Sequence, residues 1–421
     1  KLIPKQTKQR IVKEEHFGKK NLLERKTDEE IQRIIITSND YFDQISKIDD
    51  EDPFLIGIYS FLIENIQYAP IPNNQCQRLI EQQAFSIQNV KVAKVAMQYL
   101  SYYVYGNFEL ELKILNNIDI NLLQFYFSSE TVIDDDLFQF LKIFLNFSPN
   151  IARFCLDNEI YEQLLQISGI FYDDQLFQRL SLIKTAISTF NSLENCNDLY
   201  EKVIFNLADV VGNVNHRIDS QELICYCISH CLLKIADVDN SCFSCLFDDK
   251  CCFDWILTYW EADLTEINDQ TISINFNISN IIFIICYYDS AKLKRAHISK
   301  WIRNKFMFIS ENEQEEEIYR KYHTKIDLTN IYLIGALIYI LHDNPYNISD
   351  LVYNESEADP SFLDYLFDLL VNGNSQMKNI SVEFFWKLCH IENQSTITNF
   401  IYPYFINHNV IEKTIEYYEE L

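Results

Sequence analysis

Apolar residues recur along most of this chain at the three- and four-residue spacing of an amphipathic helix. From Pro53 onward they form blocks separated by short clusters of Asn, Asp and Ser, which are residues that favour helix ends and turns. Eight blocks share a long and strongly apolar character: IYSFLIENI, VAKVAMQYLSYYV, LFQFLKIFLNF, QRLSLIKTAISTF, LICYCISHCLLKIA, ISNIIFIICYY, YLIGALIYIL and SVEFFWKLCHI. The pattern predicts an all-α protein in which one kind of helix is repeated.

The spacing of these blocks predicts a solenoid. Matched late positions in seven of them are separated by 41, 45, 45, 51, 54 and 51 residues: Val104, Leu145, Phe190, Ile235, Cys286, Ile340 and Ile391. Armadillo and HEAT repeats have about 40 to 47 residues, so the longer gaps require loop insertions. Stacked units would bury one continuous core and leave an extended concave surface. We expect roughly eight repeats over residues 49–421; an irregular all-α bundle is the alternative.

Composition argues against other folds and against catalysis. The 421 residues include only seven Gly and eight Pro, whereas β-sandwiches, barrels and folds with glycine-rich loops need more of both. We find no P-loop or dinucleotide spacing and no H-E-x-x-H or G-x-S-x-G motif. The sequence therefore predicts a protein that is not an enzyme and that needs no cofactor or metal.

Charge separates the first residues from the rest. Residues 1–26 contain nine Lys or Arg and three Glu, while the whole chain has a net charge of −26. We interpret residues 1–48 as a basic arm with a helix from Asp28 to about Lys47, followed by an acidic body. This balance disfavours nucleic acid as a direct partner and favours a basic polypeptide, which can be the chain's own arm. A flexible tail and solvated acidic faces remain the plain alternatives.

Cysteine and membrane signals are weak. Apolar runs fall short of the roughly 18 residues of a membrane span, so none is predicted. The twelve Cys have no secreted-domain spacing, which favours a reducing compartment. Cys242 and Cys245 form a C-x-x-C that would suit half of a zinc site. The apolar surroundings of Cys225, Cys227 and Cys231 favour buried thiols instead.

Several segments resemble the importin-α family. Residues 114–165 are similar to one armadillo unit in the order and spacing of their helices, and residues 379–395 resemble the family's groove helix. Residues 11–30, IVKEEHFGKKNLLERKTDEE, resemble the end of an importin-β-binding segment. The resemblance covers most of the chain and implies a right-handed α-solenoid of armadillo repeats with a basic N-terminal arm.

Groove helices of that family carry a Trp and an Asn four residues apart. The Asn amide binds the backbone of an extended peptide, and the Trp rings hold the stems of Lys and Arg. Trp386 and His390 match these two positions, although Trp386 can equally be a core residue. Elsewhere other residues replace the pair: Gln98 and Tyr102, Lys184 and Ser188, and His230 and Lys234.

The resemblance implies a transport adaptor found in the cytoplasm and nucleus. Its groove, at Trp386 and His390, would bind a basic nuclear-localisation peptide. Its arm would bind an importin-β-like receptor and compete with cargo for the groove, through matching residues that we identify as Lys19, Lys20, Leu23, Arg25 and Lys26. The alternative is an armadillo scaffold in a cytoskeletal, ciliary or other assembly that has lost peptide reading.

Overall fold

Helices make up most of the described part of the chain. The computed structural model describes residues 26–48, 52–70, 72–85, 89–104, 112, 115–116, 118–167, 172–190, 193, 196–211, 217–236, 243–247, 252–261, 268–289, 293, 302, 313–343, 362–390 and 401–420. The regular structure in these ranges consists of helices without strands. The predicted all-α class is confirmed, and the succession of helices is compatible with an α-solenoid.

Two compact units make up the chain. The first comprises residues 1–166 and 181–194, and the second comprises residues 167–180 and 195–421. Helices of the first unit are α2 (Asp28–Ile45), α3 (Phe54–Glu64), α4 (Asn74–Phe85), α5 (Val90–Val104), α7 (Ile120–Phe127), α8 (Asp135–Leu145), α9 (Pro149–Asp157) and α10 (Ile160–Leu165). Helix α11 (Asp173–Phe190) contributes to both units. Within the first unit α5 packs against α3, α4 and α8.

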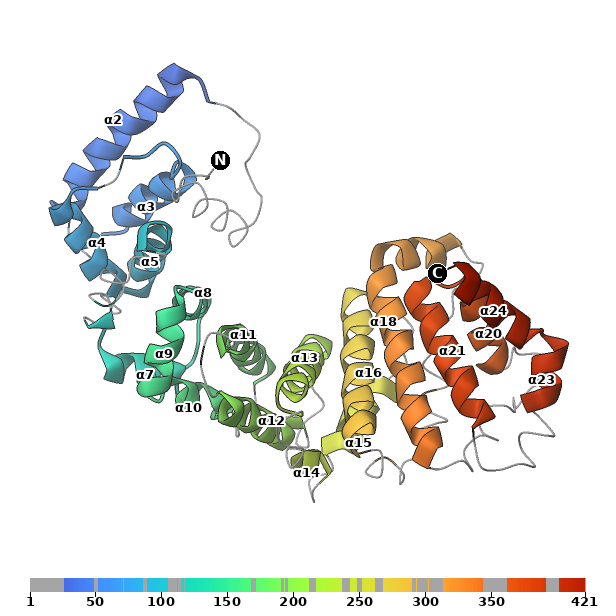
Figure 1. Ribbon diagram of the computed structural model, residues 1–421. Coiled ribbons are helices and arrows are strands. Elements are labelled where there is room, and N and C mark those ends of the chain that lie inside the picture. The colour runs from blue at the N-terminus through green and yellow to red at the C-terminus, as the bar shows by residue number, and fades with distance from the viewer. Residues whose placement is uncertain are drawn as a thin grey trace. The chain divides into compact units, whose positions relative to one another are not determined.

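The second unit is organised around a row of long helices. Its helices are α12 (Asn197–Val211), α13 (Ile218–Ile235), α14 (Ser244–Phe247), α15 (Cys252–Glu261), α16 (Asp269–Asp289), α18 (Glu313–Asp343), α20 (Phe362–Asn372), α21 (Ser375–Cys389), α23 (Tyr402–Asn407) and α24 (Val410–Glu420). Helices α13, α16, α18 and α21 lie side by side (Figure 1), each packed on the next. This packing of successive helices is compatible with the predicted α-solenoid.

Polar residues between the apolar blocks begin the helices. The Asp134 carboxylate accepts a hydrogen bond from Leu137 N at 2.8 Å at the start of α8. The Asn374 side chain accepts from Gln376 N and Met377 N, both at 3.0 Å, at the start of α21. Such caps satisfy backbone donors that have no partner inside the helix. The Asn and Asp clusters of the sequence therefore mark helix boundaries, as predicted.

One turn occurs in the same form in both units. Glu159 between α9 and α10 and Asn409 between α23 and α24 have φ of 54° and 52°, and they are the only non-glycine residues with positive φ among those described. The hydrogen bonds around them correspond position by position: Asn158 N to Phe154 O and His408 N to Tyr404 O, Glu159 N to Leu156 O and Asn409 N to Ile406 O, and Gln163 N to Glu159 O and Lys413 N to Asn409 O. A residue in the left-handed conformation is a common way for a helix to end, and both units use it in the same form.

The helix predicted at Asp28 is present as α2. Thr27 and Glu30 form a reciprocal capping box at its start, with Glu30 N donating to Thr27 Oγ1 at 3.3 Å and Thr27 N donating to Glu30 Oε2 at 2.7 Å. Phe42 and Ile45 are buried, and α2 packs against α3 and α4. The expected boundary between arm and solenoid at residues 48 and 49 therefore falls inside the first unit.

Helix α16 is the most apolar long helix of the second unit. It is the one described helix that is long and apolar enough to cross a membrane, but 78% of its apolar window is buried inside the protein. Packing against α13 and α18 accounts for this burial. Its composition is therefore explained by its position in the row of long helices.

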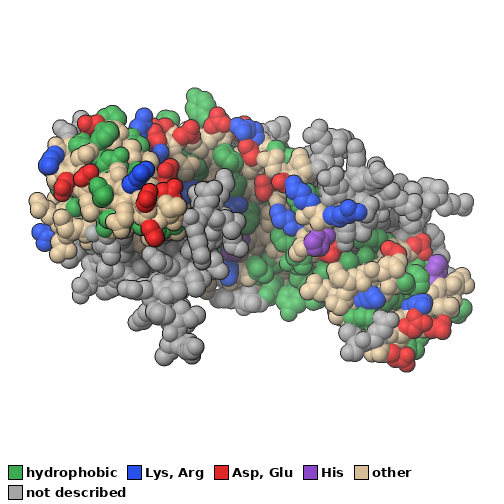
Figure 2. Space-filling view, turned by 90° about the horizontal axis from the view of Figure 1, so that it is seen from above, with side chains coloured by type: hydrophobic (Ala, Val, Ile, Leu, Met, Phe, Trp, Pro, Cys, Tyr) green, Lys and Arg blue, Asp and Glu red, His purple; other side chains and the backbone are tan. Residues whose placement is uncertain are grey.

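On the face drawn in Figure 2, the described charged side chains of the first unit are not separated into a positive and a negative patch. Lys and Arg side chains lie interspersed with Asp and Glu there. An ion pair joins α5 to α8 in this unit, with Lys94 Nζ at 2.7 Å from Asp136 Oδ1.

Candidate functional site

Aromatic side chains mark the outward face of the second unit's long helices. Phe276, Phe283 and Tyr287 lie seven and four residues apart on α16, while Tyr332 and Tyr339 lie seven apart on α18. These spacings place each set on one side of its helix. All five are half-buried or exposed, whereas most of the other residues of these two helices' C-terminal parts are buried. We call these five residues the aromatic row.

The rings of the aromatic row touch across the two helices. The Phe283 ring stacks on Tyr332 with centroids 5.5 Å apart, and Tyr287 meets Tyr339 edge-on at 5.3 Å. A side chain at Gly335 would collide with this arrangement, because its Cβ would lie 2.7 Å from a Phe283 ring carbon. The glycine thus allows the Phe283 ring to pack against the α18 backbone. The row is held by ring contacts worth about 0.5–1.5 kcal/mol each.

Charged groups flank the aromatic row. At one end Lys321 Nζ lies 3.4 Å from Asp269 Oδ1, and Lys325 Nζ donates to Ser273 Oγ at 2.6 Å. On the side of α21, burial and then the nearby Glu383 carboxylate raise the pKa of Tyr339. The Tyr339 hydroxyl therefore stays protonated, which lets it donate a hydrogen bond to a ligand.

Trp386 lies on the surface of α21 and is not a core residue. Its side chain is 55% exposed, in contrast to its neighbours Phe384 and Phe385, which are buried. The His390 ring covers it with centroids 4.0 Å apart, and Lys387 Nζ lies 5.7 Å from its ring. The structure thus brings together the two groove residues predicted from the sequence.

His390 has fewer hydrogen bonds to offer a ligand than an Asn side chain at its position would have. It caps the C-terminus of α21, and its Nδ1 lies 2.7 Å from the Trp386 backbone oxygen. That oxygen can only accept, so Nδ1 carries the proton and donates it. In the neutral ring Nε2 is left as an acceptor. In that form Nε2 can accept a hydrogen bond from a bound chain, whereas an Asn side chain offers both a donor and an acceptor.

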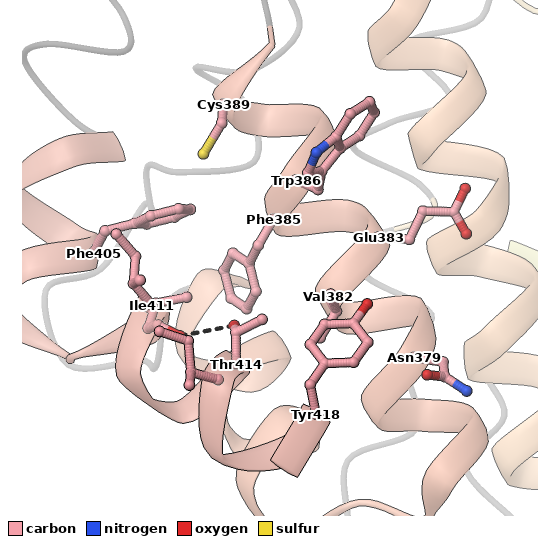
Figure 3. Close-up of a pocket in the computed structure, with 12 residues that line it drawn as sticks. Asn379, Val382, Glu383, Phe385, Trp386, Cys389, Phe405, Ile411, Thr414 and Tyr418 are labelled. Carbon is pink, nitrogen blue, oxygen red and sulfur yellow. Dashed lines mark hydrogen bonds between the residues drawn. The ribbon is translucent and has the colours of Figure 1, made fainter. Parts of the chain in front are cut away.

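A groove runs beside Trp386, between α21 and α24. Its volume is about 580 Å³, and Figure 3 shows side chains from α21, α23 and α24 around it. Exposed apolar residues form much of its wall, among them Ile411, Ile415 and Tyr418. The Thr414 hydroxyl, which also lines it, donates to the Val410 backbone oxygen at 2.8 Å. The groove is thus mostly apolar, and we call it the α21–α24 groove.

Neither the aromatic row nor this groove was predicted. A signal was available in both cases: Phe276 and Phe283 are seven residues apart, and Ile411, Ile415 and Tyr418 follow the four- and three-residue spacing of one helix face. Periodicity alone assigns such residues to a core, because it does not show which face lacks a neighbour.

The arm residues lie mostly outside the described part of the chain. This applies to Lys19, Lys20, Leu23 and Arg25. Lys26 is described, and its Nζ donates to Asn65 Oδ1 at 2.5 Å and lies 5.5 Å from the Tyr68 ring centroid. These contacts hold Lys26 on the end of α3, inside the first unit. Its ammonium is therefore engaged within the fold.

The other positions aligned with the family's Trp and Asn lie at or near the surface. Ser188 and Lys234 are exposed, and Gln98, Tyr102, Lys184 and His230 are half-buried. The His230 ring stacks on Tyr226 with centroids 5.7 Å apart. A cationic residue such as Lys184 or Lys234 would repel a basic peptide. Trp386 is thus the sole Trp at any of these positions.

The cysteines of α13 and α15 behave as small apolar residues. Cys225, Cys227, Cys231 and Cys252 are buried as free thiols. Burial raises the pKa of Cys225 and Cys231, so both stay protonated. Within the described ranges no three His, Cys, Asp or Glu side chains are placed to hold a metal ion. Cys242 and the Cys245 side chain lie outside those ranges.

Comparison with known proteins gives no family. No family model matches the chain, and no curated protein matches it. Among solved structures, the chain is similar to a crystal structure of an engineered protein at 8% identity and a TM-score of 0.40. That alignment covers 92% of this chain and 98% of the other. A likeness at this level carries no argument about fold or function.

Proposed function

We propose that this chain is a non-catalytic adaptor that binds other proteins through the long-helix face of its second unit. The observation that carries the proposal is the exposed Trp386, which lines the α21–α24 groove together with exposed apolar residues of α24. Contiguous exposed apolar surface of this kind marks interaction sites. Exposed Trp and Tyr side chains supply much of the binding energy at such sites.

The narrower form of the proposal is an importin-α-like transport adaptor with right-handed armadillo repeats. The turn that Glu159 and Asn409 share is compatible with repeated units. At the groove, Glu383 lies one turn before Trp386 on α21. A Lys or Arg stem lying on the indole would bring its charged end near this carboxylate. The arm would bind an importin-β-like receptor, in the cytoplasm and nucleus.

The second candidate is a scaffold protein that does not recognise basic peptides. It is favoured by His390, which is held within α21 by its bond to the Trp386 backbone. It is also favoured by the Lys at two of the aligned pair positions. In this form the aromatic row and the groove would bind one fixed partner within an assembly.

Peptide binding by the full chain separates the two candidates. A labelled Lys/Arg-rich extended peptide is titrated at low and high salt, and the Trp386→Ala variant is compared with Phe205→Ala on α12. Phe205 is exposed to 56%, close to the 55% of Trp386. Salt-sensitive binding that only Trp386→Ala weakens would support the transport adaptor. Receptor binding that is lost in a Lys19→Glu, Lys20→Glu double variant would support the arm's role, whereas no binding in either assay would leave the scaffold.

A further inference from the structure

We propose that the α21–α24 groove binds an amphipathic helix of a partner protein, with Lys or Arg flanking its apolar side. This deepens the proposed function and rests on its general form, which is protein binding by the second unit. It differs from the transport form in its ligand, because an extended peptide uses the indole and backbone contacts whereas a helix fills the groove with side chains.

The groove is held open by contacts at its two ends. At one end the Tyr417 hydroxyl donates to Asn379 Oδ1 at 2.9 Å and lies 3.2 Å from the Ser375 backbone oxygen. At the other end the Phe385 ring meets Phe405 of α23 edge-on at 5.4 Å. Between these ends α24 packs on α20 and α23 and makes little contact along α21. These contacts fix α23 and α24 relative to α21 and so define the walls of the groove.

The wall formed by α24 has the periodicity of a helix–helix contact. Ile411, Ile415 and Tyr418 lie at positions i, i+4 and i+7 and are 63%, 53% and 59% exposed. Across the groove Trp386 forms the opposite rim, and the buried Val382 and Phe385 form the floor (Figure 3). A partner helix with apolar residues at the same spacing would pack its ridge between the two walls.

Charge complementarity identifies the flanks of the partner. Glu383 on α21 and Glu412 and Glu419 on α24 are exposed and have no ion-pair partner within the described residues. The lysines here are engaged: Lys378 lies over the Tyr417 ring, Lys387 lies over Trp386, and Lys413 pairs with Glu416 at 2.6 Å. A ring contact leaves the lysine charge in place, so the four Glu side chains named here exceed the three Lys side chains by one negative charge. A partner helix with basic flanks would gain from it, and a second copy of the acidic α24 would be repelled.

The test uses a designed peptide of about four helical turns, with Leu at i, i+3, i+4 and i+7 and Lys at the flanks. A scrambled peptide of the same composition and a peptide with Glu in place of Lys are the controls. Binding to the full chain is measured by fluorescence anisotropy. We expect the amphipathic basic peptide to bind at least about tenfold more tightly than either control. Equal binding of the scrambled peptide would overturn the proposal.

Variants locate the binding to the groove. Ile415→Ser is expected to weaken binding about tenfold. Ile406→Ser is the matched control, because Ile406 is 74% exposed on α23 and does not line the groove. It should change affinity less than about twofold. A Glu383→Lys, Glu412→Lys double variant should weaken the basic peptide and strengthen the acidic one. Equal effects of Ile415→Ser and Ile406→Ser would contradict the assignment.

Cys389 gives a readout that does not depend on affinity. It lines the groove and is exposed, so alkylation by N-ethylmaleimide, located by mass spectrometry, should slow when the basic amphipathic peptide is bound. Unchanged alkylation at saturating peptide would overturn the proposal. A dimer in solution that Ile415→Ser dissociates would show that a second copy occupies the groove instead.

The two proposals fail separately. Loss of extended-peptide binding without loss of helix binding removes the transport form alone. If the extended peptide binds and the amphipathic peptide binds no more tightly than its controls, helix binding in the α21–α24 groove is contradicted while the transport form still stands.

Discussion

Helices α16 and α21 come from blocks of similar sequence character but have different surroundings in the second unit. Helix α16 packs between α13 and α18 and buries all of its Ile residues, whereas its aromatic residues Phe276, Phe283 and Tyr287 are half-buried or exposed. Helix α21 packs on α18 and α20 but has the α21–α24 groove on another side, where Trp386 is exposed. The difference teaches that the neighbours of a helix decide whether its apolar residues stabilise the fold or stay available to a ligand.

The largest expected effect on stability is in the core between the packed helices α13, α16 and α18. Ile281 on α16 is fully buried. Ile281→Ala should lower the free energy of unfolding by about 2–5 kcal/mol, since it removes a side chain from the core and leaves a cavity. Urea denaturation of the full chain would measure this loss. A loss below about 1 kcal/mol would mean that α16 is not packed on both sides as the comparison requires.

Ile415→Ala at the groove is the matched variant for that comparison. The side chain is 53% exposed, so its removal should change the free energy of unfolding by no more than about 0.5 kcal/mol. A larger loss would show that the groove wall is part of the core, which would remove the distinction between the two helices.

A buried hydrogen bond between α13 and α16 should give the next largest effect on stability. Asn280 on α16 donates to Ser229 Oγ on α13 at 2.7 Å, and both residues are buried. Ser229→Ala should cost about 1–3 kcal/mol, because the Asn280 amide then loses its acceptor in a buried place. Adding Asn280→Leu to Ser229→Ala should recover part of that loss in urea denaturation. Additive losses would mean that the contact contributes nothing of its own.

Among smaller effects, the groove wall depends on Tyr417. Tyr417→Phe removes the hydroxyl that reaches Asn379 Oδ1 and the Ser375 backbone oxygen. We expect a loss of about 0.5–1.5 kcal/mol, seen as faster amide hydrogen exchange in α24. Tyr418→Phe is the control, because Tyr418 is exposed at the groove. If both variants exchange alike, the hydroxyl of Tyr417 does not hold α24 in place.

The helices could be predicted from the sequence because their causes are local. Each of the eight apolar blocks has most of its residues in one helix, and caps such as Asp134 and Asn374 occupy the polar clusters between blocks. The helix expected at Asp28 begins there. Local rules of spacing and capping act within a few residues, so one sequence is enough to apply them.

The site could be predicted only in part, because it depends on contacts between distant segments. Trp386 and His390 were placed together by their four-residue spacing on one helix. The α21–α24 groove forms because α24 packs on α20 and α23, and no local pattern shows this. Likewise, nothing in the basic character of Lys26 indicates that Asn65 binds it within the first unit.

The smallest expected effect is a pH dependence at His230 on α13. Burial, followed by the nearby Lys234 ammonium, lowers the pKa of His230 below its ordinary value of 6.5. The unfolded chain therefore takes up this proton at a higher pH than the folded chain does. Above pH 6.5 neither state is protonated there and stability is unaffected; as the pH falls from 6.5 toward the lower folded pKa, stability declines. His230→Gln should reduce this slope in denaturation measured across that window. His323→Gln removes an exposed imidazole of α18 as a control, and an equal change of slope in both variants would show that the buried environment of α13 is not the cause.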